Sequence, residues 1–190
     1  MMPSSHLKDS GSDAWLTKMQ VVEPLLNALT TIIAPGLFDA GSQSISKIKK
    51  EEERTHSGEK YIKKVIGWPS VYSGISVISN RTTLFHTDRG GYESAMDLLA
   101  ACGTHDNCNI EVQELGASFQ YRPGAVLFIC GFFLQHGVFN WTGDRVCYAH
   151  YFKDKVHERN GVQRAGWENI SKYLGFMSSR FAKQEMDIIT

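Results

Sequence analysis

Residues 84–91 read Leu84-Phe85-His86-Thr87-Asp88-Arg89-Gly90-Gly91, a β-prone run that leads into a His-x-Asp pair and a glycine turn. An imidazole and a carboxylate two residues apart can turn to one face at a strand end, because side-chain direction along a strand repeats every two residues. Such a pair chelates a divalent metal ion. The pair by itself is common in chains of this length, so alone it is a weak motif.

Two distant residues strengthen the prediction of a metal site. His136 follows a second apolar, β-prone run, and with His86 and Asp88 it would complete a two-histidine, one-carboxylate triad. This arrangement is usual in non-heme Fe(II) oxygenases, where it leaves metal positions open. Arg145 opens a third run and supplies a permanently charged fork for an acidic cosubstrate. Spacing alone leaves an alternative open, in which His86 caps a strand, Asp88 starts a turn and His136 is an ordinary buried histidine.

Length and composition limit the class of protein. The chain has 190 residues, a single-domain length that can bury a core without metal or disulfide staples. Its 20 basic and 20 acidic residues cancel, so affinity for nucleic acid must come from a local patch. The four cysteines form no C-x-x-C pair, which favours a reduced, intracellular compartment. The longest apolar run, residues 125–134, is too short to span a bilayer, so we expect no membrane partner.

The N-terminal third is predicted to support the rest of the chain. Residues 1–12 are polar and aperiodic, which predicts a loose leader without a signal peptide. Apolar residues then recur at steps of three and four, so residues 13–40 are predicted to be a helical support. The helix should be kinked or divided at Pro24 and should end at residues 34–36. Residues 41–64 mix lysines with glutamates, which favours a charged, solvated loop or surface helix over a segment whose lysines touch phosphates.

From Trp68 onward the pattern is that of strands. The β-prone segments are residues 71–78, 82–85, 96–101, 108–115, 117–121, 125–134 and 146–153. Short strands at close spacing without intervening helices fit an antiparallel sandwich or barrel. We therefore expect a β core over residues 68–160, followed over residues 161–190 by a helix near residues 167–174 and a weakly ordered tail. Residues 1–190 are predicted to form one domain.

The segment from Gly143 to Tyr151, Gly-Asp-Arg-Val-Cys-Tyr-Ala-His-Tyr, resembles the fungal branch of the TET/JBP oxygenase domain. This branch of the 2-oxoglutarate- and Fe(II)-dependent dioxygenases carries a similar G-D-R-V-C-x-A-x-Y stretch after an H-G-V. The upstream motifs agree, namely Asn80-Arg81, His86-x-Asp88 and Tyr121-Arg122-Pro123-Gly124. The resemblance covers roughly residues 68–160, and its combination of motifs is specific.

The resemblance implies an α+β fold with a mainly β core, a double-stranded β-helix or jelly roll with N-terminal and C-terminal helices packed outside. It implies oxidation of the methyl group of a methylated base in DNA, 5-methylcytosine and/or N6-methyladenine, after the base is flipped out of the duplex. The cofactors would be Fe(II), 2-oxoglutarate as cosubstrate, and O₂. We expect a monomer in the nucleus, with methylated DNA as its partner.

The same resemblance assigns roles to individual residues. The catalytic Fe(II) ligands would be His86, Asp88 and His136. Arg145 would bind the far carboxylate of 2-oxoglutarate, with Cys147 as a small polar contact and Asn80 as a further donor. Tyr151 matches an aromatic residue that in relatives packs against the flipped base.

Asp97 is a candidate for reading the base. It is a lone carboxylate in the apolar run of residues 95–100, where it needs a partner. The exocyclic amine of cytosine or adenine would satisfy it; the alternatives are an ion pair with Arg89 or Arg122, or exposure at a strand end. The other candidate substrate contacts lie beside the metal pair or at the end of the last strand, and they are Arg89, Gly91, Tyr92 and Lys153.

Two other functions compete with DNA base oxidation. One is a repair-type or small-molecule 2-oxoglutarate oxygenase with the same triad. The other is a catalytically inactive jelly-roll binding module. Three intact ligand types and an intact Arg145 speak against the inactive module.

Overall fold

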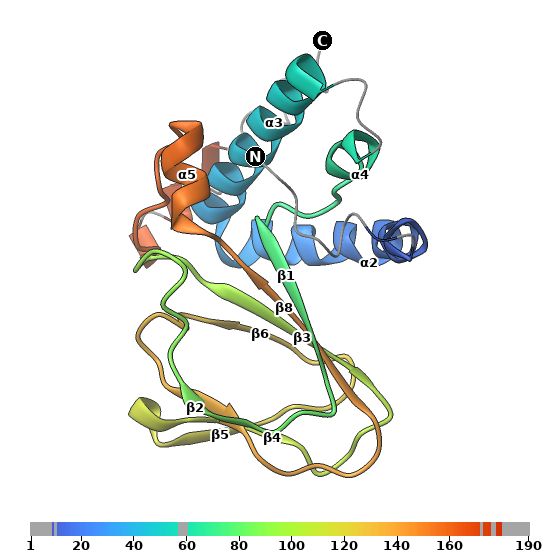
Figure 1. Ribbon diagram of the computed structural model, residues 1–190. Helices are drawn as coiled ribbons and strands as arrows, with labels where there is room; N and C mark the ends of the chain where they lie inside the picture. The colour runs from blue at the N-terminus through green and yellow to red at the C-terminus, as the bar shows by residue number, and fades with distance from the viewer. Residues whose placement is uncertain (1–8, 10, 57–60, 172, 176–177, 180–190) are drawn as a thin grey trace. The chain divides into compact units, whose positions relative to one another are not determined.

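The computed structural model describes residues 9, 11–56, 61–171, 173–175 and 178–179. The chain divides into a helical unit, residues 1–71 with 165–190, and a β unit, residues 72–164. Figure 1 colours both units along the chain. The prediction of one domain over residues 1–190 stays a prediction.

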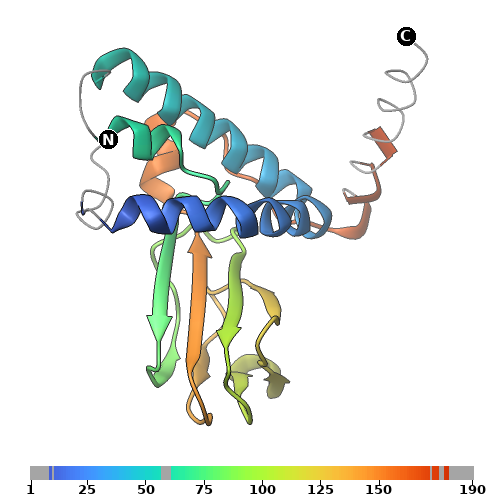
Figure 2. The same ribbon diagram turned by 90° about the vertical axis from the view of Figure 1, so that its right-hand side faces the viewer.

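The β unit contains two four-stranded antiparallel sheets, which Figure 1 shows as two layers. The first sheet consists, in spatial order, of β1 (Gly74–Ser79), β8 (Arg145–Tyr151), β3 (Asp97–Gly103) and β6 (Val126–Ile129). The second consists of β2 (Thr83–His86), β7 (His136–Val138), β4 (Asn109–Val112) and β5 (Ala117–Gln120). Figure 2 shows β1, β8 and β3 side by side with alternating directions. The chain crosses between the sheets at almost every step, which confirms the jelly-roll prediction.

The core of the β unit lies between the two sheets, because its buried cluster takes side chains from both. Leu99 and Ala101 of β3 and Cys147 of β8 meet Ile110 and Val112 of β4. On each strand these are alternate residues, as the two-residue period requires. Each large apolar side chain buried there contributes about 1.5–3 kcal/mol to folding.

The helical unit contains α2 (Ser12–Ile33), α3 (Pro35–His56) and α4 (Ile62–Ile66). The predicted end of the helix at residues 34–36 is confirmed, since Ala34 caps α2. The sequence analysis did not predict that a second long helix starts at once with Pro35, where the missing N–H of proline costs nothing. The helix α2 is not divided at Pro24. Buried residues recur along one face on both sides of that proline, for example Leu16, Met19 and Leu26, and their packing offsets the lost hydrogen bond.

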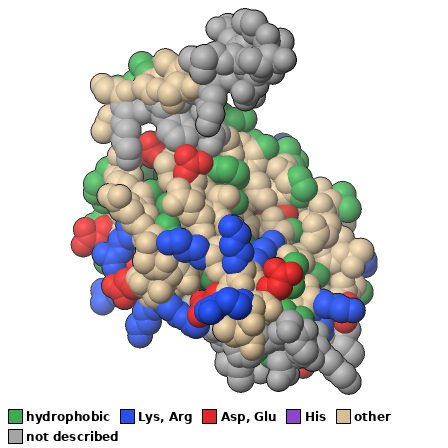
Figure 3. Space-filling model, turned by 90° about the horizontal axis from the view of Figure 1, so that it is seen from above, with side chains coloured by type: hydrophobic (Ala, Val, Ile, Leu, Met, Phe, Trp, Pro, Cys, Tyr) green, Lys and Arg blue, Asp and Glu red, His purple; other side chains and the backbone are tan. Residues whose placement is uncertain are grey.

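Of the two alternatives for residues 41–64, a charged loop or a surface helix, the structure shows a helix over most of the length. Residues 41–56 complete α3 and residues 62–66 form α4, whereas residues 57–60 lie outside the described part of the chain. The buried face of α3 consists of residues at helical spacing, namely Leu37, Ala40, Ser44 and Glu52. Some of these side chains are small or polar, so a search for periodic apolar residues does not detect this helix. On the face seen in Figure 3, basic and acidic side chains are interspersed, with no single basic patch.

The helix α5 (Asp154–Asn160) follows β8 where the sequence analysis extended the β core. Arg164 holds its first and second turns together, because one guanidinium nitrogen donates to Asp154 Oδ2 at 2.7 Å and to Glu158 Oε1 at 2.9 Å. Gly161 ends it in the left-handed conformation, with φ of 56°.

Near the C-terminus, residues 170–171 and 173–175 are helical, as part of the predicted helix at residues 167–174, and the predicted tail lies almost wholly outside the described residues. Across the described parts of the chain, no helix combines the length and apolar character needed to cross a membrane.

Candidate active site

The three predicted metal ligands meet at one end of the pairing between β2 and β7. The antiparallel register sets His86 opposite His136, with ring centroids 4.4 Å apart. Asp88 follows β2 and places Oδ1 3.5 Å from His86 Nε2 and Oδ2 3.6 Å from His136 Nε2. One potential ligand atom from each residue lies within 4.8 Å of the others. This is the cluster that the His-x-Asp spacing and the distant histidine predicted.

Both imidazoles are oriented by backbone carbonyls two residues upstream. His86 Nδ1 donates to Leu84 O at 2.9 Å, and His136 Nδ1 donates to Leu134 O at 3.0 Å. A carbonyl only accepts, so each Nδ1 carries a proton and Nε2 is the nitrogen that faces the cluster. Metal-binding histidines are commonly fixed in this way through their second nitrogen. Two imidazoles and a carboxylate form a donor set that fits Fe(II).

Gly131 is a site residue that the sequence analysis missed. Its carbonyl accepts a hydrogen bond from Asp88 N at 2.7 Å, which fixes the backbone of the carboxylate ligand. A Cβ on Gly131 would lie 2.6 Å from Asp97 Oδ2 and 2.9 Å from Asp88 Oδ2. The available signal was a glycine within the apolar run of residues 125–134, which in fact contains β6 and the turn after it.

Asp97 begins β3 and is 7% exposed. Its carboxyl group forms no hydrogen bond or ion pair with any residue that the structure describes, so neither Arg89 nor Arg122 neutralises it there. Burial, and secondarily the charge of Asp88, raise the pKa of Asp97 to about 8. Because Asp88 and Asp97 both approach the same point beside Gly131, the structure brings Asp97 next to the cluster of His86, Asp88 and His136.

Arg145 starts β8 and is held by Asn80. The Asn80 Oδ1 atom accepts from Arg145 N at 2.7 Å, and Asn80 Nδ2 donates to Asp144 Oδ1 at 3.0 Å. Both ends of the amide are therefore engaged with the start of β8. The structure places Asn80 as a support for Arg145, and its role as a direct cosubstrate donor stays a prediction.

The guanidinium of Arg145 lies in an aromatic pocket inside the β unit. Its Cζ atom is 5.6 Å from the ring centroid of Tyr121 and 5.3 Å from that of Trp141. Arg145 is 2% exposed, and its Nε has no hydrogen-bond partner among the described residues. A buried charge without a full set of partners is costly, and a carboxylate ligand would remove that cost. These residues therefore fit the far carboxylate of 2-oxoglutarate.

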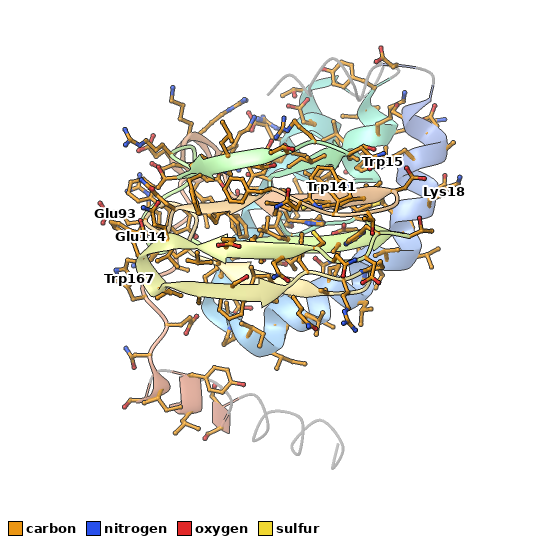
Figure 4. All side chains as sticks on the ribbon, turned by 90° about the horizontal axis from the view of Figure 1, so that it is seen from below. Trp15, Lys18, Glu93, Glu114, Trp141 and Trp167 are labelled. Carbon is orange, nitrogen blue, oxygen red and sulfur yellow. The ribbon has the colours of Figure 1, made fainter. Side chains whose placement is uncertain are left out.

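Cys147 and Tyr121 extend this pocket. Cys147 lies two residues beyond Arg145 on the same strand face, and its Sγ is 3.1 Å from the Tyr121 hydroxyl. Burial raises the pKa of the Cys147 thiol, so the thiol is neutral. The sequence analysis assigned a binding role to neither Trp141 nor Tyr121. Figure 4 shows Trp141 well away from Glu93 and Glu114, which lie at one edge of the β unit.

Tyr151 lies at the other end of the β8 face that carries Arg145 and Cys147. It pairs with Gly74 of β1, and its ring atoms lie 2.5 Å from the position of a Cβ on Gly74, so the ring depends on that glycine for space. The β3–β8 register pairs Leu98 with His150, which makes Asp97 and Tyr151 neighbours on the inner face. Lys153 is exposed, with Nζ 5.9 Å from the Tyr151 ring centroid.

The other predicted substrate residues differ in exposure. Arg89 is exposed, and its Nε lies 3.4 Å from Thr87 Oγ1. Gly91 approaches the end of β8, since a Cβ there would lie 3.2 Å from Phe152 O. Tyr92 is 5% exposed and packs edge-on against His157 at a centroid distance of 5.3 Å. The structure thus buries the ring that the sequence analysis gave as a candidate substrate contact beside the metal pair.

Residues 4–154 match the Tet/JBP family, described as the oxygenase domain of the 2OGFeDO superfamily. The bifunctional helicase and thymine dioxygenase JBP2 of Trypanosoma cruzi (strain CL Brener) is 35% identical over 69 residues, 36% of this chain and 6% of that protein. JBP2 of Leishmania major gives the same identity over the same length and the same shares.

A solved structure, NgTET1 in complex with 5mC DNA, has a similar fold, with a TM-score of 0.56 and 14% sequence identity. The similarity covers 93% of this chain and 62% of that one. The chain therefore spans a small part of the two JBP2 proteins and somewhat less than two thirds of the NgTET1 chain. At this identity the structural likeness supports the fold alone.

Proposed function

Because this chain belongs to the Tet/JBP family of the 2OGFeDO superfamily, we propose that it is an Fe(II)- and 2-oxoglutarate-dependent dioxygenase that oxidises the methyl group of a methylated base in DNA. The observation that carries the proposal is the convergence of His86, Asp88 and His136, with both Nδ1 protons fixed by carbonyls. Nuclear localisation and a monomeric state are part of the same proposal.

Each residue of the site has a task that follows from its contacts. His86, Asp88 and His136 would hold Fe(II), and Arg145 would bind the far carboxylate of 2-oxoglutarate in the pocket of Tyr121 and Trp141. When bound, Fe(II), 2-oxoglutarate and O₂ supply the oxidation of a methyl C–H bond to C–OH, with succinate and CO₂ as co-products. His136 and Arg145 are buried, at 4% and 2% exposed, whereas the side chains of His86 and Asp88 are 39% and 42% exposed, so the site opens to solvent on the side of β2.

Asp97 is proposed to recognise the flipped base. It lies next to the metal centre, has no described partner for its carboxyl group, and adjoins Tyr151, whose ring would stack on the base. A carboxylate accepts from the exocyclic amine of cytosine or adenine, whereas thymine presents O4 as an acceptor at the same edge. The preferred base therefore indicates whether Asp97 is ionised or protonated when it binds the substrate.

The function is tested by incubating the chain with Fe(II), ascorbate, 2-oxoglutarate and DNA oligonucleotides that contain 5-methylcytosine, N6-methyladenine or thymine. Product nucleosides are followed by mass. We expect oxidised product from at least one methylated base, and no product from His136→Ala. Absence of product from every base, together with succinate formation on another substrate, would refute DNA base oxidation.

The role of Asp97 has its own test. Replacing Asp97 with Ala is expected to lower turnover on DNA by about 100-fold, the scale of a misplaced substrate. The affinities for Mn(II) and 2-oxoglutarate should stay as in the wild type, because Asp97 is neither a ligand nor part of the Arg145 pocket. Unchanged turnover of Asp97→Ala would show that this carboxyl group is structural.

A further inference from the structure

The turn between β6 and β7, residues 130–134, contacts the metal centre at two points. Gly131 O accepts from Asp88 N at 2.7 Å, and Leu134 O accepts from His136 Nδ1 at 3.0 Å. The turn is closed by its own backbone, since Leu134 N donates to Cys130 O at 3.0 Å. One short segment therefore fixes the backbone of one candidate ligand and the ring of another.

The lack of a side chain at Gly131 is explained by space. Gly131 is buried and is not among the glycines with positive φ, so its backbone conformation is open to other residues. A Cβ would lie 2.6 Å from Asp97 Oδ2, 2.9 Å from Asp88 Oδ2 and 3.2 Å from Asp88 Cβ. Contacts below 3.0 Å essentially never occur at real Cβ atoms. The two carboxyl groups thus occupy the volume that any side chain would need.

We propose that Gly131 is a positioning residue that sets the spacing between the metal-binding carboxylate of Asp88 and the base-reading carboxyl of Asp97. Its carbonyl fixes Asp88 from the backbone side, and its missing Cβ lets Asp97 of β3 approach the same point. This inference rests on the proposed metal centre. It makes one buried glycine the link between metal binding and base recognition.

The test measures Mn(II) affinity by titration calorimetry and electron paramagnetic resonance on the full chain. In Gly131→Ala the new methyl group must displace Asp88, Asp97 or both. Changes to residues that orient metal ligands typically cost 10–100-fold in metal affinity, so we expect a loss of about that size. The matched control is Cys130→Ala on the same turn, because the Cys130 thiol donates to Glu93 O at 3.2 Å and forms no hydrogen bond with a candidate ligand among the described residues. Its Mn(II) affinity should equal that of the wild type.

A double-mutant cycle separates spacing from general damage to the fold. Asp97→Ala removes the closer of the two collisions, so Gly131→Ala should weaken Mn(II) binding less in that background than in the wild type. This cycle also remains informative where Gly131→Ala alone folds poorly, because the double variant relieves the tighter contact. Circular dichroism reports the folding of each variant.

Each outcome points to one idea. If folded Gly131→Ala binds Mn(II) with wild-type affinity, Gly131 does not set the spacing. The same conclusion follows if Gly131→Ala lowers Mn(II) affinity equally in the wild type and in Asp97→Ala. Neither result would contradict the proposed metal centre. Unchanged Mn(II) binding in Asp88→Ala would instead overturn the proposed metal centre itself. A loss confined to Gly131→Ala and relieved by Asp97→Ala supports the inference.

Discussion

Replacing Arg145 with Met is expected to abolish 2-oxoglutarate binding without destabilising the protein lacking cosubstrate. The guanidinium is 2% exposed, and its Nε has no partner in the described part of the chain. Its favourable contacts are the rings of Tyr121 and Trp141 and a hydrogen bond from Nη1 to Arg81 O at 3.3 Å. These contacts are opposed by the cost of burying the charge of Arg145, which is several kcal/mol per ion. Met fills a similar volume and carries no such cost.

The magnitude follows from linkage. At a 2-oxoglutarate concentration 100 times its Kd, the wild type should gain about 2.7 kcal/mol of stability. For a chain of this size each kcal/mol raises Tm by about 2–4 °C, so the expected gain is about 5–10 °C. Arg145→Met should show no such gain, while its Tm without cosubstrate equals or exceeds that of the wild type.

The assay is thermal denaturation of both proteins with and without 2-oxoglutarate, in the presence of Mn(II) so that no turnover occurs. Tyr121→Phe is the control, because it keeps the ring beside Arg145 and removes only the hydroxyl near Cys147. A wild-type-sized shift in Arg145→Met would refute the assignment of Arg145 as the carboxylate-binding residue. A large drop in Tm without cosubstrate would refute the argument from its unsatisfied charge.

Two further predictions concern the β unit. Burial and the charge of Arg164 lower the pKa of His157 despite the opposing charge of Asp154. Below about pH 6.5 the unfolded chain therefore binds a proton on His157 that the folded chain does not bind. The contribution of His157 to the free energy of unfolding should therefore be constant above about pH 6.5 and fall at lower pH by up to about 1.4 kcal/mol per pH unit. Denaturant titrations should isolate it as the difference between the wild type and His157→Phe, in which the opposing contribution of Asp97 cancels. Gly74→Ala places a Cβ 2.5 Å from the Tyr151 ring and should displace that ring. We expect kcat/KM on DNA to fall about 10- to 100-fold while the affinity for 2-oxoglutarate stays unchanged. An equal loss of kcat/KM and of 2-oxoglutarate affinity would contradict the proposal that Tyr151 acts on the base alone.

The sequence predicted the features of this chain that depend on short-range pattern. Two-residue alternation located the strands, and the spacing of His86, Asp88 and His136 located a cluster that long-range pairing of β2 with β7 then assembled. The sequence also singled out Arg145, because a permanently charged residue at a strand start is conspicuous, and its role in binding 2-oxoglutarate stays a prediction. The clustering of His86, Asp88 and His136 could be predicted because metal-ligating residue types are unusual at the ends of β-prone runs.

The errors share a different physical cause. The buried face of α3 includes Ser44 and Glu52, so its helical period is invisible to a count of apolar residues. Tyr92 looked like a surface residue beside two glycines, but it packs on His157, whose position depends on the unpredicted helix α5. Gly131 acts through the space it leaves empty, which becomes apparent only when Asp88 and Asp97 are placed in three dimensions.

Metal and cosubstrate binding should be separable by mutation, because the structure holds the two halves of the site by different means. The metal ligands are fixed by carbonyls of Leu84, Gly131 and Leu134, all within or beside strands β2 and β7. Arg145 is fixed by the Asn80 amide at the start of β8, on the other sheet. No described hydrogen bond joins these two sets of supports. A change at Asn80 should therefore weaken 2-oxoglutarate binding while Mn(II) affinity holds, and a change at Gly131 should do the reverse.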